Sequence, residues 1–230
     1  MELIPITGIG EVRAGDDVAA LIVEALTDQK IALAHRDVVV ITHKIVSKAE
    51  GKVVPIADDA GYRSLVEREA KTIIRRRGDL VITQTKHGFI CANAGVDRSN
   101  VPGSAAVLLP DRPDRSAHTI RKKLEQATAV RLAVVVTDTF GRPWRRGLTD
   151  IAIGVSGMPA LLDLKGTEDM QGRILEVSEV ALVDEIASAA DLVMGKADGV
   201  PVAIVRGLAW PDADGRASDL IRPAAEDMFR

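Results

Sequence analysis

The chain has 230 residues, 47% of them hydrophobic and 3% aromatic, with a formal net charge of −3. This composition is typical of a folded protein with one large domain or two lobes that share a core. It argues against nucleic-acid binding, which favours a basic surface and aromatic stacking platforms. It also argues against membrane insertion, because no apolar run is long enough to cross a bilayer. Since the single cysteine, Cys91, cannot form an internal disulfide and no signal-peptide pattern is present, we expect a protein of the cytoplasm.

Hydrophobic periodicity predicts the elements of the first half. In chain order these are a short strand and loop over residues 1–12, a helix over 15–30, a buried strand over 37–42 that leads into a helix, a helix over 61–77, and strands over 79–85 and 105–109. The arginines at 75–77 would cap the helix over 61–77, because cations near a helix end suit the helix dipole.

The second half continues with helices over 116–128 and 178–193, strands over 134–136, 150–157 and 201–207, a polar loop over 161–173, and a surface helix after Trp210. Ser178 would cap the helix that follows it. Because strands and helices do not alternate strictly, we predict an α+β fold with mixed, largely antiparallel sheets and flanking helices. We expect a single domain over residues 1–230, and whether it divides into two lobes is left open.

Residues 134–147, VVVTDTFGRPWRRG, carry the first candidate site. The three valines predict a strand buried on both faces, with Asp138 at its carboxyl end, where open sheets place their chemistry. A hydroxyl and three guanidinium groups follow: Thr139, Arg142, Arg145 and Arg146. A carboxylate and a hydroxyl suit a hard cation, and arginines suit phosphate oxygens. The alternative is a strand, a tight turn and a solvated basic loop.

Two further segments carry candidate ligands. The glycine-rich run over 86–103 contains Asp97, our second metal-ligand candidate, and Asn100, whose amide could reach the same anion; alternatively, both side chains hold a turn. Residues 42–48 place hydroxyls and cations at the start of a helix, although the residues alone favour a solvated helix with its lysines in water. The chain has no Walker nucleotide-binding motif, and Gly8 with Gly10 form only a weak GxG.

The chain resembles the coenzyme F420-0:L-glutamate ligase family, the γ-glutamyl ligases of deazaflavin (F420) biosynthesis, in four segments: ITHKIVSKAEG, TKHGFICANAGVDRSNVPG, VVVTDTFGRPWRRG and MGKADGVPVAIVRG. The likeness extends from the first loop to about Trp210. It implies that GTP drives the joining of L-glutamate to the terminal carboxylate of the deazaflavin F420-0, with release of GDP and phosphate. Whether further γ-glutamates are added is left open.

The same resemblance implies a pair of divalent cations in each subunit, Mg²⁺ or Mn²⁺, with K⁺ as an activator. It also implies small-molecule substrates, a fold of the family's own and a homodimer of intertwined subunits. Some bacterial relatives carry a flavin-binding reductase-like domain after the ligase domain. Because this chain ends at Arg230, we expect no such domain.

Roles carry over by position in the matching segments. Asp97 and Asp138 match ligands of one cation, and Thr139 matches a ligand of the other. Nucleotide contacts match Ile9, Gly10, Glu11, Val12, His43, Lys48, Asn100, Met194, Gly195, Lys196, Ala197, Asp198, Gly199, Val200 and Pro201. His43 stands where relatives often have serine. Lys196 stands where some relatives have a metal-binding glutamine. Since an ammonium cannot ligate a cation, either Lys196 binds phosphate instead, or other groups hold the second cation in this protein.

The chemistry of these residues suits amide formation. Transfer of a phosphoryl group to a carboxylate gives an acyl phosphate, whose phosphate the glutamate amine can displace, so positioning and charge neutralisation are the main tasks. Arg142 and Arg145 would clamp substrate phosphates or carboxylates. Two alternatives stay open: a related ligase for another carboxylated phosphodiester or a modified deazaflavin, and a non-catalytic protein that binds metal and nucleotide. Four histidines and one cysteine without paired spacing argue against a zinc site.

Overall fold

A five-stranded sheet forms the centre of the computed structural model, which describes residues 1–101 and 103–228. Its strand order is β1 (Glu2–Ile6), β12 (Val202–Arg206), β2 (Val38–Thr42), β8 (Ala133–Arg142) and β9 (Arg145–Ser156). Strands β2 and β8 run parallel, and every other neighbouring pair is antiparallel. The predicted α+β fold with a mixed, largely antiparallel sheet is confirmed.

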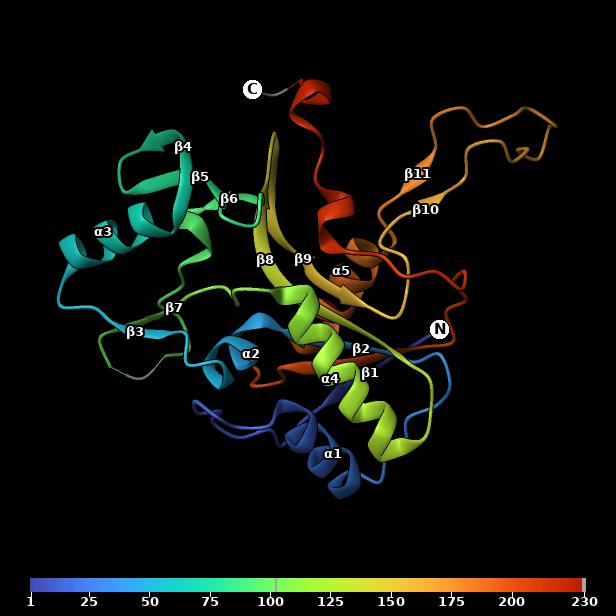
Figure 1. The fold of residues 1–230 in the computed structure, drawn as a ribbon, viewed down its shortest axis with the longest axis horizontal. Helices are drawn as coiled ribbons and strands as arrows, with labels where there is room; N and C mark the ends of the chain where they lie inside the picture. The colour runs from blue at the N-terminus through green and yellow to red at the C-terminus, as the bar shows by residue number, and fades with distance from the viewer. Residues whose placement is uncertain (102, 229–230) are drawn as a thin grey trace.

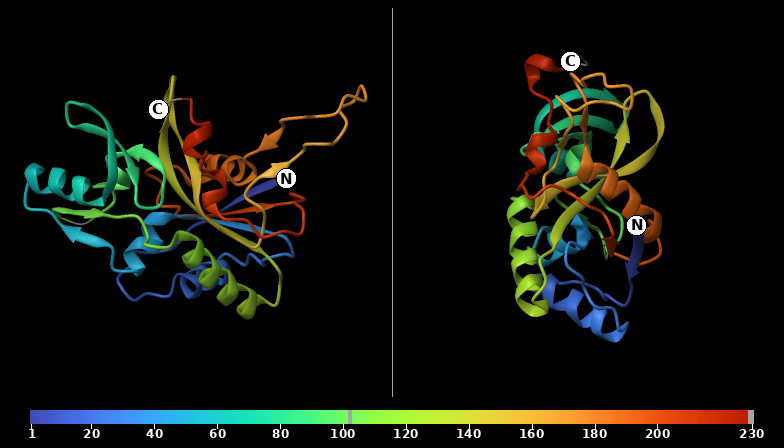
Figure 2. Two further views of the ribbon diagram at one scale, coloured as in Figure 1. Left: turned by 45° about the horizontal axis from the view of Figure 1, so that its top comes forward. Right: turned by 90° about the vertical axis from the view of Figure 1, so that its right-hand side faces the viewer.

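Helices cover both faces of this sheet (Figures 1 and 2). Helices α1 (Val18–Asp28) and α4 (Pro113–Thr128) pack against each other, and α4 also contacts β8 and β9. Helix α5 (Leu182–Met194) contacts β9 and β12 from the other side. Since both faces are covered, the middle strands consist of consecutive apolar residues, and the valines at 38–40 and 134–136 are fully buried, as predicted.

A smaller set of elements lies beside the central sheet (Figure 1). It comprises α3 (Asp59–Glu69), a three-stranded sheet of β4 (Ala70–Arg77), β5 (Leu80–Thr85) and β6 (Ile90–Ala92), the pair β3 (Val53–Pro55) and β7 (Ala105–Val107), and the turn η1 (Asn93–Gly95). These elements enclose an apolar cluster of their own around Leu65, Val66 and Ala106. Helix α2 (His43–Ala49) connects them to the end of β2.

The predicted helix over residues 61–77 is wrong in its second half. Helix α3 ends at Glu69, and the next eight residues form β4, which pairs antiparallel with β5. Thr72, Ile73 and Ile74 are β-branched and favour a strand once a partner strand is available. The arginines at 75–77 therefore do not cap a helix; Arg76 instead pairs with Glu67 across 2.6 Å.

The boundaries of the second half also differ from the predictions. Residues 142–146 form the tip of the β8–β9 hairpin, whose turn is Pro143 and Trp144 between the paired Arg142 and Arg145, rather than a free basic loop. Helix α4 begins at Pro113 instead of Ser116. Helix α5 begins at Leu182 instead of Ser178, because β10 (Leu162–Asp163) pairs with β11 (Glu179–Val180) and draws Ser178 into an extended arm. The tail holds two short 3-10 helices, η2 (Ala217–Leu220) and η3 (Ala224–Glu226). None of the helices in the described ranges could span a membrane, judged by length and apolar character.

Candidate functional site

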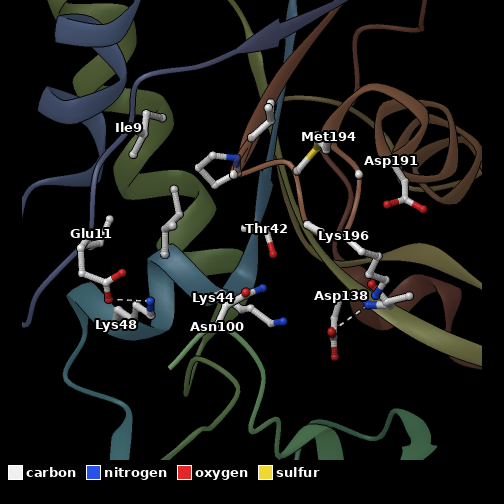
Figure 3. Close-up of a pocket in the computed structure, with 18 of the residues that line it drawn as sticks. Ile9, Glu11, Thr42, Lys44, Lys48, Asn100, Asp138, Asp191, Met194 and Lys196 are labelled. Atoms are coloured by element: carbon white, nitrogen blue, oxygen red, sulfur yellow. Dashed lines mark hydrogen bonds and ion pairs between the residues drawn. The ribbon is translucent and has the colours of Figure 1, made fainter. Parts of the chain in front are cut away.

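A pocket of about 590 Å³ opens where the parallel strands β2 and β8 end (Figure 3). Thr42 and Thr137 are the last paired residues of these strands, and Asp138 follows directly. The wall comes from five segments far apart in the sequence: the loop 9–12, helix α2 with Thr42 before it, residues 100–101, the β8–β9 hairpin, and the end of α5 with the turn after it. The end of the parallel pairing between β2 and β8 thus places Asp138 at the edge of the sheet, as we expected.

Figure 3 shows how the charged groups are distributed in this pocket. Lys48 and Glu11 lie at one end, with Asp138 and Lys196 at the other. Between these ends lie Thr42, Lys44 and Asn100. Ammonium groups and carboxylates therefore alternate along the pocket, which suits a ligand that carries several anionic groups and cations of its own.

The two lysines of α2 do not point into water, so the alternative of a solvated helix is wrong. The Lys48 side chain is 8% exposed, and its Nζ lies 2.7 Å from Oε1 of Glu11. The Lys44 Nζ lies 2.8 Å from Oδ2 of Asp97 and donates a 2.6 Å hydrogen bond to Ser99 Oγ. Because a buried ammonium needs a charged or polar partner, each lysine is held at the pocket wall by an acid from another segment.

Asp97 itself stands just behind the pocket wall and reaches it through Lys44. Its Oδ1 accepts from the Ser99 backbone N–H at 2.7 Å, so Asp97 holds a turn as well as facing a cation. Burial acts to raise the pKa of Asp97, yet the hydrogen bonds from Lys44 and Ser99 outweigh burial and the pKa lies below its usual value. Asn100, three residues later, lines the pocket.

Asp138 lines the pocket and is backed by a buried histidine. The His43 ring is 1% exposed, with Nε2 3.3 Å from Oδ1 of Asp138 and Nδ1 3.3 Å from Ser47 Oγ. Among the described residues His43 Nε2 has no hydrogen-bond partner, so the ring packs beside Asp138 without hydrogen-bonding to it, and its predicted contact with the nucleotide stays a prediction. Cys91 also lies nearby; burial, together with the Asp138 charge, raises the pKa of its thiol to about 12. This cysteine is a protonated, inert part of the core.

The end of α5 with the turn after it, and the loop 9–12, contribute most of the predicted nucleotide contacts to the pocket. Met194, Gly195, Lys196, Ala197, Gly199, Val200 and Pro201 all line it, as do Ile9, Gly10, Glu11 and Val12. Gly195 has a φ of 61°, and a Cβ there would lie 2.1 Å from Oδ2 of Asp198. This φ, together with a ψ of 174°, is a backbone conformation that essentially only glycine adopts, so the turn itself requires Gly195. Asp198 thus shapes the turn from outside the described pocket wall.

Sequence reasoning missed two acids of the pocket, Asp150 and Asp191. Asp150 is 5% exposed and accepts hydrogen bonds from the hydroxyls of Thr137 and Thr139. Burial and the charge of Asp150 raise the pKa of Asp191, and Lys196 counteracts them. Asp150 faces Thr139 across the hairpin, a register that the sequence did not reveal because the turn was predicted as a loop.

Arg142 and Arg145 are exposed and pair with each other on either side of the turn of the β8–β9 hairpin. The Arg142 Nη2 donates to the backbone oxygen of Arg146 at 2.8 Å. Within the part of the chain that the structure describes, neither arginine belongs to the pocket wall. Their role as clamps for anionic substrates stays a prediction.

The oxygen donors of the pocket fit a hard cation. Asp138 offers a carboxylate, Thr139 a hydroxyl, and Asp150 a second carboxylate behind that hydroxyl. Among residues 1–101 and 103–228, no three His, Cys, Asp or Glu side chains gather closely enough to hold a metal ion by themselves. Mg²⁺ is usually bound by one or two carboxylates together with water and substrate phosphates, rather than by a protein cage. This donor set matches that mode of binding.

Comparison with known proteins identifies the family of the chain. A sequence model of the family described as F420-0:Gamma-glutamyl ligase matches residues 8–207. Among similar proteins, a "Coenzyme F420:L-glutamate ligase" of Methanothermobacter thermautotrophicus is 45% identical, covering 100% of this chain and 99% of its own. Proteins of the same name from Methanocaldococcus jannaschii and Methanopyrus kandleri are 44% and 42% identical, covering 84% and 96% of this chain, and 84% and 94% of their own. The chain belongs to the F420-0:gamma-glutamyl ligase family.

Proposed function

We propose that this protein joins L-glutamate to the terminal carboxylate of the deazaflavin F420-0 and that it uses GTP to do so. Family membership supports the ligase activity, because relatives over nearly the full length are named coenzyme F420:L-glutamate ligases. The observation that carries the proposal is the pocket: segments that resemble the family's signature meet around one cavity with lysines and oxygen donors on its wall.

The pocket has the size and charges that a nucleoside triphosphate requires. Its volume of about 590 Å³ lies in the range of small-molecule sites. Lys44, Lys48 and Lys196 supply positive charge to phosphate oxygens, and the glycines of the 194–201 turn let the backbone approach closely. Asn100 adds an amide that can donate or accept. These features support GTP as the ligand, with the loop 9–12 closing one end.

Asp138 and Thr139 would hold divalent cations together with the phosphates, Mg²⁺ or Mn²⁺ being suited to such oxygen donors. Bound cations would neutralise charge on the phosphate oxygens. Asp97 would contribute once Lys44 leaves its carboxylate, because the ammonium now occupies one of its oxygens. A pair of cations in each subunit, a K⁺ activator and an intertwined homodimer remain parts of this proposal.

The reaction would proceed in two balanced transfers. First, a carboxylate oxygen of F420-0 forms a bond to the γ-phosphorus of GTP, and the bond to the β-phosphate oxygen breaks, which releases GDP and leaves an acyl phosphate. Next, the amine of L-glutamate attacks the acyl carbon, the C–N bond forms, and phosphate leaves as the amine loses its proton. The lysines of the pocket would hold the phosphates in line, since positioning and charge stabilisation dominate phosphoryl transfer.

Mass spectrometry of the deazaflavin product tests this function. Incubation with F420-0, L-glutamate, GTP and Mn²⁺ should add one or more glutamate residues, with one GDP and one phosphate released for each. The Asp138→Asn variant keeps the size of the side chain but removes its charge, and its rate should fall at least about 10- to 100-fold. A chain that binds GDP and Mn²⁺ yet forms no product would refute the ligase activity and favour a binding protein. Full activity of Asp138→Asn would refute only the metal assignment.

A further inference from the structure

The carboxylate of Asp150 accepts hydrogen bonds from the hydroxyls of Thr139, which lines the pocket, and of Thr137, which is buried behind it. Thr139 Oγ1 donates to Oδ1 of Asp150 at 2.5 Å, and Thr137 Oγ1 donates to Oδ2 at 3.0 Å. Thr137 and Asp150 are 0% and 5% exposed, so these bonds are shielded from water. Because a carboxylate only accepts hydrogen bonds, both hydroxyl protons point toward Asp150.

The hairpin fixes this arrangement. Thr139 and Asp150 are directly paired across β8 and β9, which places their side chains on the same face. Thr137 precedes Thr139 by two residues and shares that face. Helix α5 holds the backbone in place, since Ser188 Oγ donates to the Asp150 carbonyl oxygen at 2.9 Å and also contacts Thr149 Oγ1 at 2.9 Å. Asp150 therefore has little freedom to turn toward other partners.

The direction of the Thr139 proton decides what its oxygen can bind. A hydroxyl can ligate a cation only through a lone pair, so its proton must point away from the cation. With that proton committed to Asp150, the Thr139 oxygen presents lone pairs to the pocket that it lines together with Asp138. Without Asp150 the hydroxyl could rotate and present its proton instead, which would repel a cation.

We propose that Asp150 is a positioning residue that fixes the Thr139 hydroxyl as an oxygen ligand for a divalent cation. This inference rests on the proposed function, because it assumes that a cation binds beside Asp138 and Thr139. Asp150 lines the same pocket, so direct ligation by its carboxylate is the competing role. The two roles differ in one respect: a positioning residue acts only while the Thr139 hydroxyl is present.

A double-mutant cycle with Mn²⁺ binding as its readout separates them. Mn²⁺ affinity is measured by electron paramagnetic resonance in the presence of GDP, for the wild type, Asp150→Asn, Thr139→Val and the double variant. Asparagine keeps the shape of aspartate. Its amide oxygen can accept a hydrogen bond from only one of the two hydroxyls, because its NH2 group donates hydrogen bonds instead of accepting them. Asp150→Asn should weaken Mn²⁺ binding about 10-fold, as expected for a residue behind a ligand. In the Thr139→Val background the same change should cost less than about 2-fold, because coupled residues are not additive.

Matched variants guard against a general loss of structure. In a Thr139→Ser background, which keeps the hydroxyl, Asp150→Asn should again cost about 10-fold. Thr137→Val removes the other hydroxyl bonded to the same carboxylate and should leave Mn²⁺ affinity within about 3-fold of the wild type. Thermal unfolding of each variant, without metal, checks that it is folded.

The outcomes are distinct. Equal losses from Asp150→Asn in the wild-type and Thr139→Val backgrounds would overturn the inference and identify Asp150 as a direct ligand, while leaving the proposed function intact. No loss in either background would overturn it as well. A wild-type chain that binds no Mn²⁺ with GDP would overturn the metal part of the proposed function and this inference with it.

Discussion

Replacement of Lys48 by methionine should weaken GTP binding without unfolding the protein. The Lys48 side chain is 8% exposed and lines the pocket, so a charge-assisted hydrogen bond from its ammonium to a nucleotide oxygen would be shielded from water. Such a bond contributes about 1.5–3 kcal/mol. Since each 1.4 kcal/mol corresponds to about 10-fold in affinity, the dissociation constant for GTP should rise about 10- to 100-fold.

The free energy of unfolding should change far less in this variant. Methionine keeps the unbranched apolar stem of lysine and removes a charge that is costly to bury. Its partner Glu11 is 56% exposed, so the carboxylate remains hydrated when the ion pair is lost. Because the Lys48 ammonium is buried, the cost of removing it from water offsets much of its attraction to this partly exposed carboxylate. We therefore expect a change of about 1 kcal/mol or less in urea unfolding.

Isothermal titration with GTP measures the effect, and Lys52→Met is the matched control. Lys52 also forms an ion pair, with Asp111 at 2.5 Å, but it lies outside the described pocket wall. Its substitution should leave GTP affinity within about 2-fold of the wild type. Unchanged GTP affinity in Lys48→Met, or equal losses in both variants, would refute the assignment of Lys48 to the nucleotide.

Two further predictions concern stability. A Cβ at Gly154 would lie 2.6 Å from the Pro113 backbone, so Gly154→Ala should lower the free energy of unfolding by about 1–3 kcal/mol. Gly141→Ala is the control and should cost much less, because a Cβ there would have nothing within 4 Å. Equal losses for the two variants in urea unfolding would contradict this prediction. Burial raises the pKa of Asp184, so the native state binds this proton more tightly than the unfolded chain does. The contribution of Asp184 to the free energy of unfolding therefore falls as pH rises from its unfolded pKa through its folded pKa. Asp184→Asn should therefore gain stability relative to the wild type across that window, and a constant difference between pH 3.5 and 7 would refute the assignment.

Local sequence patterns were sufficient for the middle of the fold. Strands β2 and β8 are runs of β-branched residues bounded by polar ones, and such runs can be buried on both faces without any long-range information. Asp138 could be placed at the edge of the sheet because it directly follows one of these runs. The position of this strand end, rather than any single residue type, is what allowed Asp138 to be placed from the sequence.

Features that depend on pairing between distant segments were not predictable. Residues 70–77 have an apolar spacing that fits a helix, and only the hydrogen bonds to β5 make them a strand. Asp150 belongs to the site because of its register opposite Thr139. Lys44 is held by Asp97, which lies far along the chain. Sequence periodicity carries no information on such partners.

Crystals grown with GDP and Mn²⁺ would test the central claim most directly, through anomalous diffraction from the metal. The account predicts Mn²⁺ peaks within ligand distance of the Asp138 carboxylate and of the Thr139 hydroxyl, with the diphosphate bound along the pocket between loop 9–12 and the 194–201 turn. A nucleotide bound elsewhere on the molecule, or Mn²⁺ bound away from Asp138, would contradict it.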